Sequence, residues 1–81
     1  MLIETQMKSW LGRAMIELIV NGENRRISAG ATLAEFIASL QLEEGRLAVE
    51  RNREIVPKST YETVILADGD QLEIVHFIGG G

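Results

Sequence analysis

Apolar residues occupy every second position from Ile16 to Val20, and polar residues flank most of them. This alternation is typical of a half-buried strand that opens at Met15. Asn21-Gly22 follows, and both residue types tolerate positive φ, so the pair predicts a hairpin turn. A second strand is expected through Arg25 to Ser28. The patterned part of the chain therefore begins with a β-hairpin.

The segment after the hairpin changes to a helical period. Thr32 and Glu35 have the spacing of a capping box, in which the Thr32 hydroxyl accepts from the Glu35 amide and the Glu35 side chain reaches back. Apolar residues then recur at i, i+3, i+4 and i+7, which is one helical stripe: Leu33, Phe36, Ile37 and Leu40. We expect one amphipathic helix that ends near Leu40.

Short strand patterns follow the helix. Residues 47–50 predict a third strand, and residues 55–56 predict a short fourth strand. Residues 58–62 are mainly polar, and Tyr61 among them is expected to cover an edge of the sheet. Residues 71–76 predict the last strand, with Leu72 and Ile74 on one face and Glu73 and Val75 on the other.

This element order predicts an α+β roll with one mixed sheet of four to five strands packed on one main helix. A single apolar helix stripe can cover only one face of one sheet, and a helix that crosses over after a hairpin packs back with right-handed sense. We expect the domain to span 15–81. Residues 1–14 show no strand alternation and are expected to form an N-terminal extension, either flexible or an upstream start; a docking helix is the alternative.

Composition narrows the class of protein. The chain has 81 residues and no cysteine, so it predicts one small domain without a disulfide or a thiolate metal site. Residues 15–81 hold 6 basic and 11 acidic side chains, a net charge of −5, which argues against nucleic acid as a partner. No apolar run approaches the ~20 residues of a membrane helix. We expect a cytoplasmic protein, monomeric when alone, that docks on a basic protein surface.

The sequence ends in two apolar residues and three glycines: Phe77, Ile78, Gly79, Gly80 and Gly81. Terminal glycines cost much backbone entropy to order, but a flexible chain without Cβ atoms can enter a narrow channel in another protein. Extended, residues 77–81 span at most ~17 Å. The α-carboxylate of Gly81 is ionised at neutral pH and is a poor electrophile, so acyl chemistry there requires activation. The alternative is an inert terminus, on which two exposed apolar residues would be a liability.

Four segments resemble the ThiS family, the sulfur carriers of thiamin thiazole biosynthesis: VNGENRRI (20–27), TLAEFIASL (32–40), LAVERNREIVPKS (47–59) and ADGDQLEIVHFIGGG (67–81). Together they span nearly all of 15–81. The resemblance implies a ubiquitin-like β-grasp fold with a flexible Gly-Gly tail. It also implies a carrier and cosubstrate with no catalytic site and no bound cofactor of its own.

The resemblance further implies a reaction cycle and its partners. An adenylating enzyme of the ThiF/E1 class, which uses ATP, would convert the Gly81 carboxylate to an acyl-adenylate. Sulfur from a cysteine desulfurase would replace AMP and give a thiocarboxylate, and thiazole synthase would accept that sulfur. Gly79, Gly80, Phe77 and Ile78 would enter the partner's active site. Val75 and Ile19, on the sheet face away from the helix, are the candidate docking residues.

Other functions remain open from the sequence alone. The molybdopterin-synthase small subunits and carriers of other sulfur pathways also end in Gly-Gly, and a protein modifier or a plain interaction module would fit the same pattern. His76 without a nucleophile is not a catalytic set. Asp68 and Asp70 are expected to form a turn and not a metal site. Arg51 and Arg53 are expected to be exposed, although one could pair with an acidic partner.

Overall fold

A computed structural model describes residues 14–77. The strands are β1 (Met15–Val20), β2 (Glu23–Ser28), β3 (Leu47–Arg51), β4 (Glu54–Ile55) and β5 (Gln71–His76), and the helix is α2 (Leu33–Ser39). Two short 3-10 turns, η1 (Glu44–Arg46) and η2 (Lys58–Thr60), lie in the connections. The hairpin, the helix and the last strand are where the sequence predicts them.

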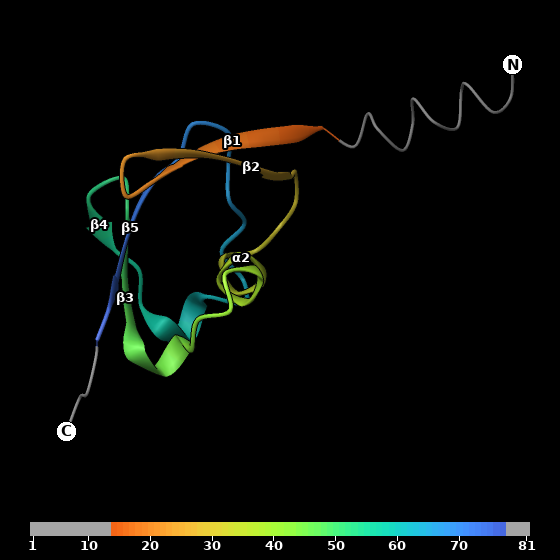
Figure 1. Ribbon diagram of the computed structural model, residues 1–81. Coiled ribbons are helices and arrows are strands. Elements are labelled where there is room, and N and C mark those ends of the chain that lie inside the picture. Colours follow the sequence, from red (N-terminus) through yellow and green to blue (C-terminus); the bar gives the residue numbers. More distant parts are fainter. Residues whose placement is uncertain (1–13, 78–81) are drawn as a thin grey trace, which may run out of the picture.

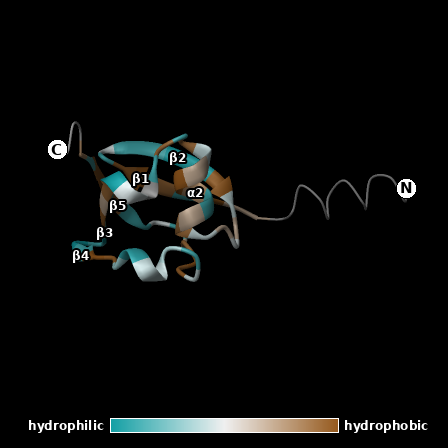
Figure 2. Ribbon diagram, turned by 90° about the horizontal axis from the view of Figure 1, so that it is seen from below, coloured by the Kyte–Doolittle hydropathy of each residue, from teal (hydrophilic) through white to brown (hydrophobic). Residues whose placement is uncertain are grey.

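The five strands form one mixed sheet in the order β2-β1-β5-β3-β4. β1 and β5 are parallel neighbours, and the other pairs are antiparallel. α2 lies across one face of this sheet (Figure 1). The predicted α+β roll is therefore confirmed, with the last strand of the chain in the middle of the sheet and the polar strand β2 at one edge (Figure 2). The two arginines of β2 suit that edge, since charged residues discourage pairing with another chain.

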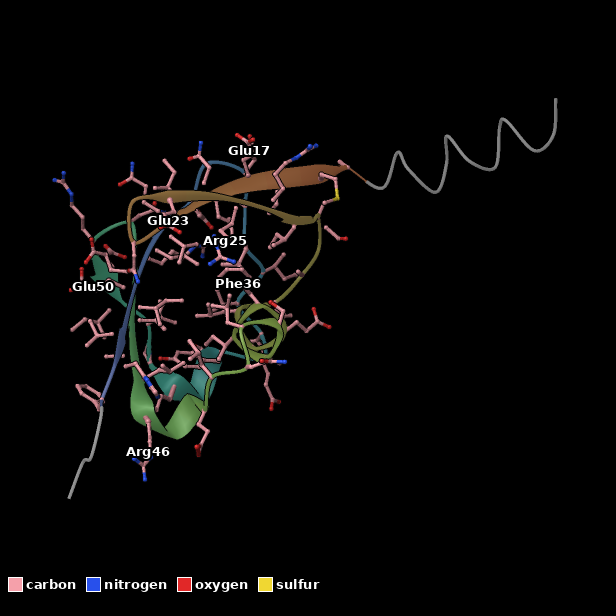
Figure 3. All side chains as sticks on the ribbon, in the orientation of Figure 1. Glu17, Glu23, Arg25, Phe36, Arg46 and Glu50 are labelled. Carbon is pink, nitrogen blue, oxygen red and sulfur yellow. The ribbon has the colours of Figure 1, made fainter. Side chains whose placement is uncertain are left out.

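The core lies between α2 and the sheet. Alternation along β1 and β5 directs one face of each strand toward the helix, and the stripe on α2 meets them there. Figure 3 shows Phe36 in the space between the helix and the sheet. The buried members from these three elements are Ile16, Leu18, Val20, Leu33, Phe36, Ile37, Leu72 and Ile74.

The start of the helix is held by two kinds of partner. In the predicted capping box, Glu35 N–H donates to the Thr32 hydroxyl at 3.1 Å, and Thr32 N–H donates to Glu35 Oε1 at 2.9 Å. The N–H groups of Leu33 and Ala34 donate to the carbonyls of Val64 and Tyr61, each at 2.8 Å. The loop after η2 therefore supplies acceptors for helix donors that have no partner within the helix.

Tyr61 corrects the sequence prediction. It was expected to cover an edge of the sheet, but it is 1% exposed and belongs to the core. The η2 turn folds residues 58–60 back on themselves, with Tyr61 N–H donating to the Lys58 carbonyl at 3.1 Å. This turn directs the Tyr61 side chain into the core, while the polar residues beside it remain on the surface.

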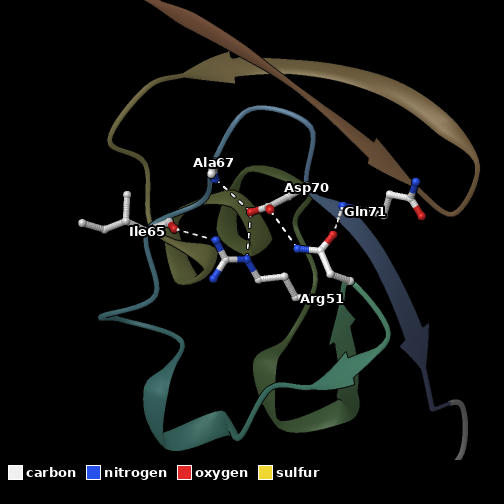
Figure 4. A network of polar contacts seen from close by, with 6 residues as sticks. Arg51, Ile65, Ala67, Asp70 and Gln71 are labelled. Atoms are coloured by element: carbon white, nitrogen blue, oxygen red, sulfur yellow. Dashed lines mark hydrogen bonds and ion pairs between the residues drawn. The ribbon is translucent and has the colours of Figure 1, made fainter.

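Arg51 follows the alternative that the sequence left open. It was expected to be exposed or to pair with an acidic partner, and it is half-buried with its Nε 2.8 Å from Oδ2 of Asp70 (Figure 4). Asp70 is 6% exposed and also accepts from the Ala67 amide at 2.8 Å and from Asn52 Nδ2 at 3.0 Å. Asn52 Oδ1 in turn accepts from the Gln71 amide. These contacts tie the β3–β4 turn to the beginning of β5.

The same contacts set the charge state of Asp70. Burial opposes ionisation, but hydrogen bonds from Ala67, Asn52 and Arg51, together with the charge of Arg51, outweigh it and hold the pKa of Asp70 below its ordinary value of 3.8. A carboxylate whose pKa is lower in the folded state stabilises the fold above its unfolded-state pKa. That stabilisation is lost as the pH falls through the lowered value.

We predict that Asp70→Asn lowers the free energy of unfolding at pH 7 by about 1–3 kcal/mol, because buried donors lose their charged acceptor. As the pH falls below the ordinary value of 3.8 and then through the lowered pKa of Asp70 in the folded protein, the carboxylate becomes protonated and the difference between variant and parent should shrink. Urea unfolding at pH 7 and pH 3 measures both effects. Glu62→Gln, which removes an exposed carboxylate, is the control. A stability difference that is equal at both pH values would contradict this role of Asp70.

Candidate functional site

β5 carries the chain from the middle of the sheet to the predicted tail. On one side it pairs with β3 from Leu72 to His76, and Phe77 N–H extends this ladder by donating to the Arg46 carbonyl at 2.8 Å. The tail candidates Ile78, Gly79, Gly80 and Gly81 lie outside the described residues. The structure therefore fixes where the tail starts, at the end of a central strand whose last residues pair with β3.

Asn21 ends the pairing of β5 on the other side. The regular parallel register of β1 and β5 covers only Ile19 with Gln71 and Val20 with Leu72. Beyond it, Asn21 N–H donates to the Leu72 carbonyl at 2.9 Å. The Asn21 side chain then accepts from Ile74 N–H at 2.9 Å and donates to the Ile74 carbonyl at 3.2 Å. The side-chain amide of Asn21 thus makes the hydrogen bonds to β5 that the backbone of one further β1 residue would make.

The sequence predicted the turn at Asn21 but not the contacts of its side chain. The Asn-Gly pair was interpreted as a turn, and the φ angles of +50° at Asn21 and +85° at Gly22 agree with that. The contacts of the Asn21 side chain with β5 had no signal in the local sequence, because Ile74 lies 53 residues away.

The sheet face away from α2 presents the candidate docking residues. Val75 and Phe77 are 53% and 49% exposed, and they alternate with the buried Leu72 and Ile74. Ile19, on the same face, is half-buried. The structure places Val75 next to the start of the tail and Ile19 on the neighbouring strand, near the opposite end of β5. Their docking role stays a prediction.

Acidic side chains flank these apolar residues. Glu50 of β3 and Glu73 of β5 are direct cross-strand partners, and both are exposed. Figure 3 shows Glu50 on the outer side of the sheet. Like charges directly opposite each other destabilise a sheet by a few tenths of a kcal/mol, roughly. A shallow hollow beside them is lined by Ile19, Glu50, Arg53, Gln71 and Glu73. This surface suits a partner with a basic and partly apolar face.

Two other acidic side chains, Asp68 and Asp70, accept hydrogen bonds within the domain. Asp68 accepts from the Glu17 amide, and Asp70 belongs to the network of Arg51. Within residues 14–77, no three histidine, aspartate or glutamate side chains lie together as metal ligands. No helix in that range is long and apolar enough to cross a membrane.

A mixed five-stranded sheet that opens with a hairpin, carries one covering helix and places its last strand in the middle defines a ubiquitin-like β-grasp domain. The ThiS family model matches residues 18–81. The chain therefore belongs to the ThiS family of sulfur carrier proteins.

Sulfur carrier proteins and thiazole synthases are among the proteins similar to the chain. The sulfur carrier protein ThiS of Bacillus subtilis is 52% identical over 50 residues, which are 62% of this chain and 76% of that protein. A thiazole synthase of Paramagnetospirillum magneticum is 52% identical over 66 residues, which are 82% of this chain and 20% of that protein. The chain spans about a fifth of the length of this thiazole synthase and of that of Magnetococcus marinus.

A solved structure has the same fold. The crystal structure of the thiamine biosynthesis protein ThiS from Geobacter metallireducens superposes with a TM-score of 0.70 at 26% sequence identity. The match covers 82% of this chain and all of that one.

We predict that Asn21→Gly lowers the free energy of unfolding by about 1 kcal/mol, since it removes both side-chain hydrogen bonds to Ile74 but keeps a residue that accepts positive φ. Asn21→Asp is the matched control, because it retains an acceptor for Ile74 N–H and loses only the donor. Its free energy of unfolding should lie between those of the parent protein and Asn21→Gly. Urea unfolding gives the free energies, and faster amide exchange at Ile74 should accompany the loss. Equal stability of all three proteins would contradict the contact.

Proposed function

We propose that this domain carries sulfur for thiamin biosynthesis as a thiocarboxylate on Gly81, and that thiazole synthase accepts the sulfur. One observation carries the proposal. The central strand of the sheet, β5, continues without a linker into Phe77-Ile78-Gly79-Gly80-Gly81. Family membership supports sulfur as the cargo, and the thiazole synthases that contain a similar segment support the acceptor.

The chemistry would proceed in three steps. An oxygen of the Gly81 carboxylate attacks the α-phosphorus of ATP on an adenylating enzyme of the ThiF/E1 class, and pyrophosphate leaves. Sulfur at the oxidation level of sulfide then attacks the acyl carbon, and AMP leaves. If the donor is a persulfide derived from a cysteine desulfurase, a thiol must cleave the resulting S–S bond. Finally, an acceptor bound to thiazole synthase takes the sulfur, the acyl C–S bond breaks, and an oxygen from water or from the acceptor restores the Gly81 carboxylate for another cycle.

The chain would act in this cycle as a cosubstrate. We propose that it has no catalytic site and binds no cofactor of its own, with ATP held by the activating enzyme. The domain's contribution is positional, because it presents the tail from a rigid strand and docks through the outer sheet face. The glycines at 79–81 would let the backbone adopt whatever φ and ψ the partner's channel imposes.

The outer face would supply recognition. Val75, Phe77 and Ile19 provide apolar area, and Glu50 with Glu73 provides negative charge. A basic partner would relieve the repulsion between these two carboxylates when it binds. Charge of this kind mainly raises the association rate and excludes wrong partners.

We predict that incubation with ATP, a ThiF-like enzyme and a sulfur source raises the intact mass of the chain by one oxygen-to-sulfur exchange. Deletion of Gly81, or addition of one residue after it, should abolish the gain and leave the thermal unfolding transition unchanged, because the change lies outside the described core. Intact mass spectrometry is the measurement. A loaded product from the extended chain, untrimmed, would contradict Gly81 as the reactive residue.

We predict that Val75→Asp raises the KM for the carrier in the loading reaction about tenfold, as expected when an interface side chain contributes about 1.4 kcal/mol. Ile65→Asp is the matched control, because Ile65 is also an exposed apolar residue, at 59%, but lies outside the strands of the sheet. Both variants should fold like the parent. Equal KM values for the two variants would show that the outer face is not the docking surface.

A further inference from the structure

The edge of β5 at His76 has polar backbone groups that the fold leaves open. Phe77 N–H donates to the Arg46 carbonyl, so the N–H and carbonyl of the alternate residue His76 face away from β3. They face the side on which β1 has already ended at Val20. The Asn21 side chain satisfies Ile74, one step earlier, and does not reach His76. Among residues 14–77, no backbone hydrogen bond partner is present for His76 on that side.

A hollow lies next to this edge, on the helix side of the sheet. Its apolar lining consists of Val20, Leu40, Leu42 and Ile74, and its polar lining consists of Asn21, Glu23, Arg25 and His76. Figure 3 shows Arg25 on the same side of the sheet as α2. In a strand added beside β5, alternate side chains would point toward this hollow. An apolar side chain fits it best, since Leu40 and Leu42 are only half-buried there.

We propose that an extended segment of thiazole synthase pairs with the free edge of β5 at His76 and places one apolar side chain in the hollow beside Leu40, Leu42 and Ile74. This inference rests on the proposed function. It adds a backbone contact to the side-chain contacts of the outer face, in the manner of peptides that add a strand to an exposed sheet edge.

The length of the chain beyond the edge argues that an enzyme acting at Gly81 reaches this edge, and the thiazole synthases that are similar to this chain over 66 residues argue for thiazole synthase as that enzyme. Residues 77–81 span at most ~17 Å when extended. An enzyme that reacts with the carboxyl group of Gly81 must therefore bring its own surface within about 17 Å of His76. The open edge and its hollow lie at the start of that span. An unpaired strand edge in this position would otherwise be a liability for the free carrier.

Two variants at position 76 isolate the backbone N–H. His76→Pro removes it, and proline is tolerated in a strand where the N–H faces away from the neighbouring strand. Val75 already has the extended backbone that a residue before proline prefers. His76→Ala is the reference, because it removes the imidazole and keeps the N–H. We expect His76→Pro to bind purified thiazole synthase about fivefold more weakly than His76→Ala does, by calorimetry with the unloaded carriers. Equal affinities would overturn the pairing.

Amide exchange gives a second measurement that needs no variant. In the free carrier, Val75 and Phe77 amides should exchange slowly, because both pair with β3, and the His76 amide should exchange fast. With thiazole synthase bound, the His76 amide should slow at least tenfold. A complex in which His76 still exchanges fast would overturn the pairing and leave the sulfur carrier function standing, whereas the absence of any complex would overturn both. Protection of His76 in a dimer of the carrier alone would assign the edge to a second copy and overturn the proposal.

Discussion

The parallel pairing of β1 with β5 is the contact on which the rest of this structure depends. Parallel neighbours cannot be joined by a tight turn. The segment of the chain that connects β1 to β5 is therefore long, and it forms the second strand of the hairpin, the helix and the β3–β4 pair. Ile19 and Val20 pair with Gln71 and Leu72, and the stripe on α2 covers the joint, where Leu18 and Leu72 are at most 1% exposed. This closure places the last strand in the middle of the sheet.

A tail that leaves from a central strand has a fixed origin. β5 has β1 on one side and β3 on the other, and the Asp70 network holds its first residue through Asn52. Ordering a segment on binding costs conformational entropy in proportion to its length. Because the chain is hydrogen-bonded as far as Phe77, the described residues of β5 and Phe77 would add little to that cost if the proposed partner binds the tail.

Part of the fold could be predicted from the sequence because it depends on interactions between residues close together in the chain. The alternation in β1 and β5, the positive φ at Asn21-Gly22 and the capping box of Thr32 and Glu35 each depend on neighbours within a few residues. The burial of Tyr61 was not predicted, and the acidic partner of Arg51 could not be named, because both depend on contacts with distant parts of the chain. Tyr61 turns inward through η2, and Arg51 meets Asp70 across 19 residues. At the site, the sequence indicated the exit strand and the face of Val75, while the roles of residues 78–81 stay predictions.

β5 can serve two kinds of contact at once because alternate residues present different groups. Glu73 and Val75 direct their side chains to the outer face while their backbone groups bond to β3. His76 directs its backbone groups to the opposite edge, beside the hollow on the helix side. Side chains can discriminate partners by charge and shape, whereas a backbone edge binds extended chains with little regard to sequence. The proposed backbone contact of thiazole synthase at the edge and the proposed side-chain contacts at the outer face therefore do not compete for the same groups of β5.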